Sequence, residues 1–165
     1  ETLQGDREAV RLWAPWVHVE SEPEGLRLTH RADATLWPID PVDLKHVPDL
    51  FQPLAFTLAG RGQSAVLTGL DNLVVKETDR LKAVAEVLNR IGCTGGYRGG
   101  TFIQGGSITA KAPMTFDPNI DHRMALSIAP LALLLPSITI KDPGVVDKSY
   151  PTFWDDLRKA GYRVE

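Results

Sequence analysis

Three places in the chain combine a cation with an acidic residue just where a helix is predicted to begin. They are Lys76-Glu77-Thr78-Asp79-Arg80, Asp121-His122-Arg123 and Asp147-Lys148-Ser149. A cation at a helix N-terminus opposes the helix macrodipole and typically costs a few tenths to about 1 kcal/mol. The simplest compensation is an anionic ligand, held by these cations and by the free N–H groups of the same helix ends. The residue types therefore predict an anion-binding site.

Each motif also has a structural interpretation that needs no ligand. Thr78 and Asp79 are ordinary helix caps, and Lys148 taken alone is typical of a solvated lysine. Asp49 is by itself better explained as another cap. Arg123 favours a functional interpretation, because it opens an almost wholly apolar stretch whose burial would turn a first-turn arginine toward a cleft.

The overall composition is that of an ordinary globular domain. The chain has 165 residues, of which 43% are hydrophobic and 24% charged, enough to bury a core. A formal net charge of −3 argues against general nucleic-acid binding, so a basic site must be local. The longest apolar run, residues 124–135, is too short to span a bilayer. A single cysteine, Cys93, excludes an internal disulfide and is typical of a reducing compartment, which predicts a cytoplasmic protein.

Other kinds of site have little support in the sequence. His18, His30 and His46 have no metal-ligand spacing, and Cys93 has no His or Cys partner pattern. No Gly-x-Ser-x-Gly nucleophile motif is present. The glycines of residues 95–100 lack the strand-then-helix context of a nucleotide loop, so a hairpin or a mobile loop is the preferred interpretation. We therefore expect neither a metal site nor a serine nucleophile.

Helical and strand patterns are mixed along the whole chain. The predicted helices are 6–14, 49–59, 78–91, 122–135 and 151–160. The predicted strands are 17–20, 26–30, 64–68, 73–75, 101–104, 107–110, 137–141 and 163–165. This mixture predicts an α/β or α+β fold.

The pattern repeats with a period of about 72 residues. Asp49 and Asp121 are 72 residues apart, and each precedes an apolar helix and then a strand. Lys76 and Lys148 have the same separation. The chain would then hold the tail of one copy, a complete second copy and most of a third, arranged as one pseudo-symmetric domain. Equivalent helix starts would converge near one end of that domain and bring distant cations together.

The motifs resemble those of the 5-enolpyruvylshikimate-3-phosphate synthase family. The two most specific strings run from Asn72 to Leu81 and, 41 residues after Arg80, from Asp121 to Ala125. They separate this family from the related UDP-N-acetylglucosamine enolpyruvyl transferases. Three shorter matches occur in the same order: Leu3-Gln4-Gly5-Asp6, His46-Val47-Pro48-Asp49, and Asp142-Pro143 leading to Lys148-Ser149-Tyr150-Pro151.

The resemblance implies a reaction and a fold. Phosphoenolpyruvate and shikimate 3-phosphate would give the enolpyruvyl ether and phosphate by addition and elimination, without metal or organic cofactor. The implied fold is an inside-out α/β barrel domain with a pseudo-threefold repeat of βαβαββ-type units. Aromatic amino-acid biosynthesis by the shikimate pathway is the implied context.

The resemblance also assigns expected roles to residues of this chain. Asp49 and Glu77 are the implied catalytic acid–base pair, Glu77 near the methylene carbon and Asp49 near the attacking hydroxyl. The implied substrate-binding residues are Asp49, Asn72, Lys76, Arg80, His122, Arg123 and Lys148. Of these, Arg80 and Arg123 would hold the phosphoenolpyruvate carboxylate, since a guanidinium binds a planar carboxylate through two parallel hydrogen bonds.

The chain matches only part of this family. Residues 1–165 are expected to form a single domain that lacks its first short segment and the second domain of a two-domain, monomeric enzyme, because the chain opens at Glu1 without a methionine. Alone it is expected to have negligible activity. Ile120 stands where the family often has a polar residue, which would loosen a contact beside the site. Two alternatives stay open: a transferase with another anionic acceptor, and a non-catalytic module that binds anions or a partner domain.

Overall fold

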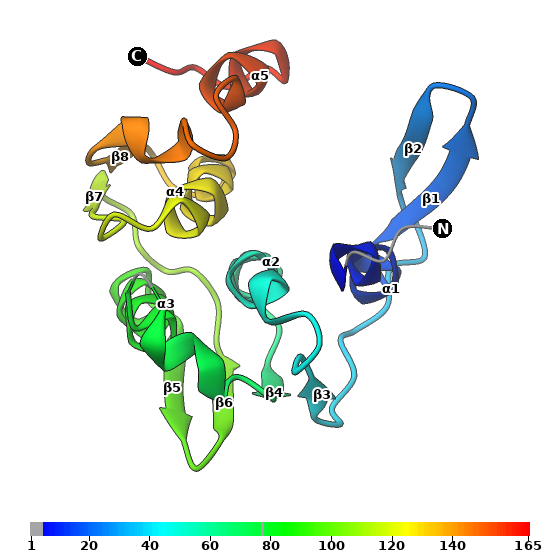
Figure 1. Ribbon diagram of the computed structural model, residues 1–165, viewed down its shortest axis with the longest axis vertical. Coiled ribbons are helices and arrows are strands. Elements are labelled where there is room, and N and C mark those ends of the chain that lie inside the picture. The colour runs from blue at the N-terminus through cyan, green and yellow to red at the C-terminus, as the bar shows by residue number, and fades with distance from the viewer. Residues whose placement is uncertain (1–4, 77) are drawn as a thin grey trace.

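The computed structural model describes residues 5–76 and 78–165, in which helices alternate with short strands (Figure 1). The α-helices are α1 (Ala9–Trp13), α2 (Phe51–Gly60), α3 (Arg80–Arg90), α4 (His122–Ile128) and α5 (Phe153–Lys159). The strands are β1 (Val17–Glu22), β2 (Gly25–His30), β3 (Val42–Asp43), β4 (Ala65–Thr68), β5 (Thr94–Arg98), β6 (Thr101–Gly105), β7 (Met114–Phe116) and β8 (Ile138–Ile140). Short 3-10 helices occupy Gly5–Glu8, Pro48–Leu50, Asp71–Val75, Ala129–Leu133 and Pro143–Val146.

One copy of the predicted repeat is complete. Strands β3, β4, β6 and β5 form a sheet in that order, in which β3 and β4 are parallel and the other pairs are antiparallel. Helix α2 connects β3 to β4, and α3 connects β4 to β5. The chain order of this copy is therefore βαβαββ, as expected.

The other elements match parts of the same unit. Strands β7 and β8 pair in parallel and are connected by α4, as β3 and β4 are connected by α2. Helix α1 is followed by the antiparallel hairpin β1–β2, as α3 is followed by β5–β6. In Figure 1 the hairpin β1–β2 extends away from the rest of the molecule, and α4, β7, β8 and α5 form the opposite end. The element order confirms the predicted repeat and the mixed α/β class.

Helix α2 lies at the centre of the molecule between α3 and α4 and contacts both (Figure 1). A helix that is apolar on nearly all faces is expected to be buried. The buried side chains of α2 are Phe51, Gln52, Leu54, Ala55, Phe56, Leu58 and Ala59. Burying a large apolar side chain typically contributes about 1.5–3 kcal/mol, so α2 is a main source of stability for this part of the chain.

Several predicted elements were wrong. Residues 73–75 form a 3-10 helix rather than a strand, because Leu73 turns inward to full burial and its N–H bonds to the Leu70 carbonyl at 2.9 Å. Residues 107–110 and 163–165 are not strands either. The predicted helix 122–135 changes to a 3-10 helix after Ile128, because Pro130 has no N–H to continue the α-helical ladder. Strands β3, β5 and β7 were missed, since they are short or rich in glycine.

The glycine-rich segment is a hairpin, one of the two interpretations offered for it. Gly99 and Gly100 connect β5 to β6 with φ angles of 57° and 79°. Two consecutive residues with positive φ are typical of the tight turn that matches the twist of paired strands, and glycine adopts it without steric cost.

The backbone immediately before α4 is left-handed at two consecutive residues. Asn119 has a φ of 53° and Ile120 a φ of 62°. Asparagine tolerates this region, whereas a β-branched side chain such as isoleucine is strained there. The Ile120 side chain is 75% exposed, so little burial offsets the strain. The unusual residue at position 120 therefore has its main consequence in the backbone.

Replacing Ile120 with asparagine is predicted to stabilise the chain. The substitution relieves strain of about 1 kcal/mol or more, so the free energy of unfolding should rise by about 1 kcal/mol. Urea-induced unfolding of both proteins measures the difference. The matched control is Ile39→Asn, since Ile39 is 93% exposed and does not have a positive φ. An equal change in the two variants, or a loss of stability in Ile120→Asn, would contradict the prediction.

Candidate functional site

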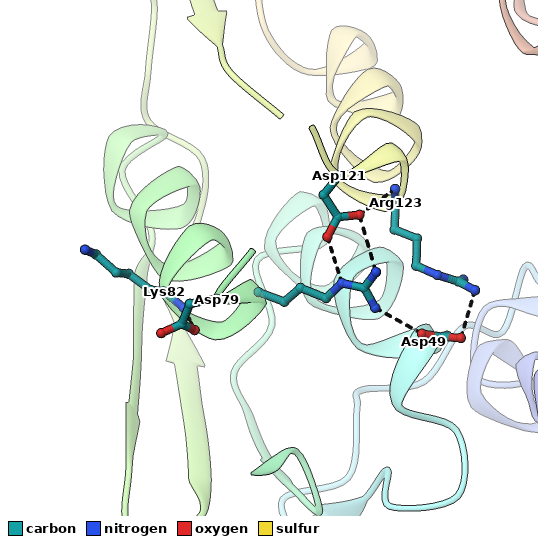
Figure 2. Close-up of polar contacts among 6 residues, drawn as sticks. Asp49, Asp79, Lys82, Asp121 and Arg123 are labelled. Atoms are coloured by element: carbon teal, nitrogen blue, oxygen red, sulfur yellow. Dashed lines mark hydrogen bonds and ion pairs between the residues drawn. The ribbon is translucent and has the colours of Figure 1, made fainter. Parts of the chain in front are cut away.

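Three helix beginnings meet in the structure, and each contributes charged side chains to one cluster (Figure 2). Arg80 is the first residue of α3. Asp121 is the N-cap of α4, and Arg123 lies in its first turn. Asp49 belongs to the 3-10 helix that leads directly into α2. The repeat places these beginnings at corresponding positions, and the packing of α2 against α3 and α4 brings them together.

Arg80 is the buried centre of this cluster. Its side chain is only 2% exposed. Its Nε donates to Asp121 Oδ2 at 2.7 Å, and Nη2 lies 3.5 Å from Asp121 Oδ1. The third nitrogen, Nη1, donates to Asp49 Oδ1 at 3.1 Å. The guanidinium is therefore held along one edge by Asp121 and reaches Asp49 with its other end.

Asp49 connects the two arginines. While Oδ1 accepts from Arg80, Oδ2 accepts from Arg123 Nη2 at 2.8 Å. The side chains of Asp49 and Arg123 are 36% and 31% exposed, so this edge of the cluster borders solvent. The two guanidinium groups converge on one carboxylate, which confirms the expectation that cations from separate stretches of sequence meet.

Asp121 is the carboxylate that the sequence reasoning did not single out. It is completely buried, and besides holding Arg80 it accepts the backbone N–H of Arg123 at 2.9 Å through Oδ1. A capping role was expected for this position, and the neighbouring helix has the same kind of cap, in which Asp79 accepts from the Lys82 N–H. The available signal was its separation of 72 residues from Asp49.

The cluster is balanced in charge without any ligand. The positive charges of Arg80 and Arg123 are matched by the carboxylates of Asp49 and Asp121. The sequence argument invoked an external anion to offset cations at helix beginnings, and the structure supplies internal ones instead. A buried guanidinium requires such partners, because leaving it unpaired would cost several kcal/mol. Only Asp49, at the exposed edge, occupies a position that an incoming carboxylate could take.

The other predicted residues lie outside this cluster. Asn72 and Lys76 are exposed, at or directly after the 3-10 helix Asp71–Val75. Lys148 is also exposed and follows the 3-10 helix Pro143–Val146, which packs against α4. His122 is half-buried at the first position of α4. Glu77 lies outside the described residues.

Other chemistry has no visible site in the described part of the chain. Residues 5–76 and 78–165 contain no group of three or more His, Cys, Asp or Glu side chains arranged to hold a metal ion. Burial raises the pKa of the Cys93 thiol, so this side chain is not a thiolate at neutral pH. No helix within the same residues has the length and apolar character needed to cross a membrane. The arginine cluster is therefore the candidate site.

Comparison with known sequences agrees with the motifs. The sequence model of EPSP synthase (3-phosphoshikimate 1-carboxyvinyltransferase) matches residues 1–157. The 3-phosphoshikimate 1-carboxyvinyltransferase of Bacteroides fragilis is 33% identical over 167 residues, covering 99% of this chain and 40% of the relative. The enzyme of the same name from Aeropyrum pernix is 39% identical over 147 residues, covering 86% of this chain and 33% of the relative. The chain thus spans about 40% of the length of the Bacteroides relative.

Comparison with solved structures agrees with the fold. EPSP synthase from Acinetobacter baumannii superposes with a TM-score of 0.72 at 27% identity, over 90% of this chain and 37% of that one. The enolpyruvyl transferase NikO from Streptomyces tendae has a TM-score of 0.65 over 96% of this chain and 36% of its own, and at 13% identity it shares the fold alone. Family match, motifs and fold lead to one conclusion: the chain belongs to the EPSP synthase family.

Proposed function

We propose that this chain is one domain of an enzyme that transfers the enolpyruvyl group of phosphoenolpyruvate to the 5-hydroxyl of shikimate 3-phosphate and releases phosphate. Family membership supports the reaction class. The observation that carries the proposal is the convergence of Arg80 and Arg123 on a single carboxylate at the meeting point of three helix beginnings. Two guanidiniums aimed at one carboxylate form a receptor for a planar anion.

The substrate carboxylate takes the place of Asp49 in this proposal. Asp49 offers one oxygen to each arginine, and the carboxylate of phosphoenolpyruvate has the same shape and charge. Because Asp49 and Arg123 border solvent, the exchange needs no rearrangement of the buried part of the cluster. The exchange also frees Asp49, whose carboxylate can then turn toward the hydroxyl of the acceptor.

The freed groups then support addition followed by elimination. Glu77 protonates the methylene carbon, the acceptor hydroxyl attacks the neighbouring carbon, and Asp49 accepts the hydroxyl proton. Elimination of phosphate from the tetrahedral intermediate removes a proton from the new methyl group and restores the double bond. Lys148 acts at the phosphate of phosphoenolpyruvate, while Asn72, Lys76 and His122 contact the acceptor or support the site. Neither a metal nor an organic cofactor takes part.

The proposed site lies between two domains. The chain accounts for about 40% of the length of its Bacteroides relative, which supports a second domain as the partner that closes over both substrates. We place this full-length enzyme in the cytoplasm as a monomer. Closure around two polyanionic substrates would exclude water and strengthen the contacts of the arginines.

The first test replaces Arg123 with methionine in the full-length enzyme. Loss of one guanidinium from the carboxylate receptor should raise the KM for phosphoenolpyruvate on the order of 100-fold, with the KM for shikimate 3-phosphate much less affected. Steady-state kinetics with each substrate varied in turn measures both values. An unchanged KM for phosphoenolpyruvate would contradict the proposed role.

Arg123 is preferred to Arg80 for this test because of burial. Replacing Arg80 would leave the buried Asp121 carboxylate without its cation, which typically costs about 3–5 kcal/mol of folding stability. Arg123 pairs with Asp49 at an exposed edge, where an ion pair typically contributes about 1 kcal/mol or less. Arg123→Lys is the matched control for charge, since it keeps the cation but loses the planar fork.

The second test replaces Glu77 with glutamine, also in the full-length enzyme. Glutamine has nearly the same shape but cannot donate an acidic proton to carbon, so turnover should fall at least about 100-fold. Calorimetric titration with shikimate 3-phosphate should show binding close to that of the parent enzyme. Turnover equal to that of the parent would instead favour a non-catalytic, anion-binding role for this domain.

The third prediction concerns the 165-residue chain without a second domain. Positioning of two substrates contributes much of the rate of such a reaction, and half of an interdomain site cannot supply it. We expect no measurable phosphate release from phosphoenolpyruvate and shikimate 3-phosphate, and at most weak anion binding. Robust turnover by the isolated chain would overturn the two-domain proposal.

A further inference from the structure

We infer that Asp121 is a positioning residue that sets the geometry of the two-arginine carboxylate receptor. The inference rests on the proposed function, because it concerns how the proposed phosphoenolpyruvate site is held in shape. Asp121 does not face the exposed edge of the cluster, where Asp49 and Arg123 lie. It acts through Arg80 and through the beginning of α4.

The first observation is the way in which Asp121 holds Arg80. Its two oxygens lie along the Nε–Nη2 edge of the guanidinium, at 2.7 and 3.5 Å (Figure 2). A planar group held along one edge has little freedom to rotate. The remaining nitrogen, Nη1, is consequently directed at Asp49 and at any carboxylate that replaces it.

The second observation concerns Arg123. Asp121 Oδ1 accepts the backbone N–H of Arg123 at 2.9 Å, and this bond fixes where α4 begins. The same carboxylate is therefore the common reference for the Arg80 side chain and the Arg123 backbone. The separation between the two guanidiniums, which the receptor depends on, is set from one point.

The third observation is the strained backbone that leads into Asp121. Asn119 and Ile120 are both left-handed, with φ angles of 53° and 62°. Strained conformations of this kind persist where the surrounding structure requires them, and they are frequent at functional sites. Here the strained pair directs the chain so that a fully buried carboxylate precedes α4.

Asp121 and Asp49 therefore have different tasks. Asp121 is completely buried, so a substrate anion cannot reach its bonds to Arg80 without opening the core. Asp49 is 36% exposed and holds only one nitrogen of each arginine. Asp121 is the permanent partner of the receptor and Asp49 is the replaceable one.

The experiment replaces Asp121 with serine in the full-length enzyme. Serine remains a good N-cap, but it removes the carboxylate that holds Arg80. The KM for phosphoenolpyruvate should rise about 10-fold to 100-fold, because small misplacement of a binding group has effects of this size. The KM for shikimate 3-phosphate should change far less. Asp121→Asn, which is nearly isosteric, takes its place if the serine variant does not fold.

The matched control is Asp79→Ser. Asp79 caps α3 by accepting the Lys82 N–H at 3.0 Å, as Asp121 caps α4. A capping role alone predicts the same result for the two serine variants, namely a loss of stability with an unchanged KM for phosphoenolpyruvate. That result in Asp121→Ser would overturn the inference.

A second measurement does not depend on turnover. In enzyme with ¹⁵N-labelled arginine, the Arg80 Nε–H should exchange slowly with solvent, both without substrate and with saturating phosphoenolpyruvate. Rapid exchange in either state would also overturn the inference. If the parent enzyme neither binds nor turns over phosphoenolpyruvate while this N–H is protected, the proposed function fails and the link between Asp121 and Arg80 stands.

Discussion

A guanidinium that leaves water must find carboxylates at fixed positions, and this requirement of Arg80 organises the whole site. Arg80 is 2% exposed and is bonded to Asp121, which is completely buried. Such a pair is costly to assemble, because both charges lose their hydration. Its value lies in direction: the pair determines which nitrogen of Arg80 points to the open edge. The remaining elements of the fold serve to bring these two residues together.

The repeat explains how residues far apart in the sequence arrive at one place. Asp49 and Asp121 occupy corresponding positions before α2 and α4, and both accept hydrogen bonds from Arg80. In corresponding units that pack around a common centre, equivalent helix beginnings face the same region. Free N–H groups at these beginnings add partial positive charge there. The arrangement favours the binding of a polyanion without a metal ion.

The resting cluster is neutral, and this has a consequence for binding. Asp49 already satisfies both guanidiniums, so an incoming carboxylate gains only the difference between its own contacts and those of Asp49. Exchange of one carboxylate for another keeps the buried charges paired throughout. It also couples substrate binding to the release of Asp49, the group proposed to act on the acceptor. Binding and activation would then be parts of one event.

The local parts of this protein were determined by its sequence. Asp79 and Asp121 cap helices because a cap needs only a side chain and the next few N–H groups, and both were visible as caps in their motifs. The spacing of 72 residues likewise indicated the repeat and the convergence of helix beginnings. Where local preference and packing disagreed, the sequence misled, as with residues 73–75, whose valines favoured a strand although the burial of Leu73 imposes a 3-10 helix.

The tertiary structure alone decided how the charges are shared. Arg80 pairs with Asp121 across 41 positions, and Arg123 pairs with Asp49 across 74. No local rule states which of two equivalent aspartates becomes buried and which stays at the exposed edge. That difference arises from the packing of α2, α3 and α4, which closes over Asp121 and leaves Asp49 open. Motifs can identify the charged residues of such a site, but only the packing of the helices assigns each of them its partner.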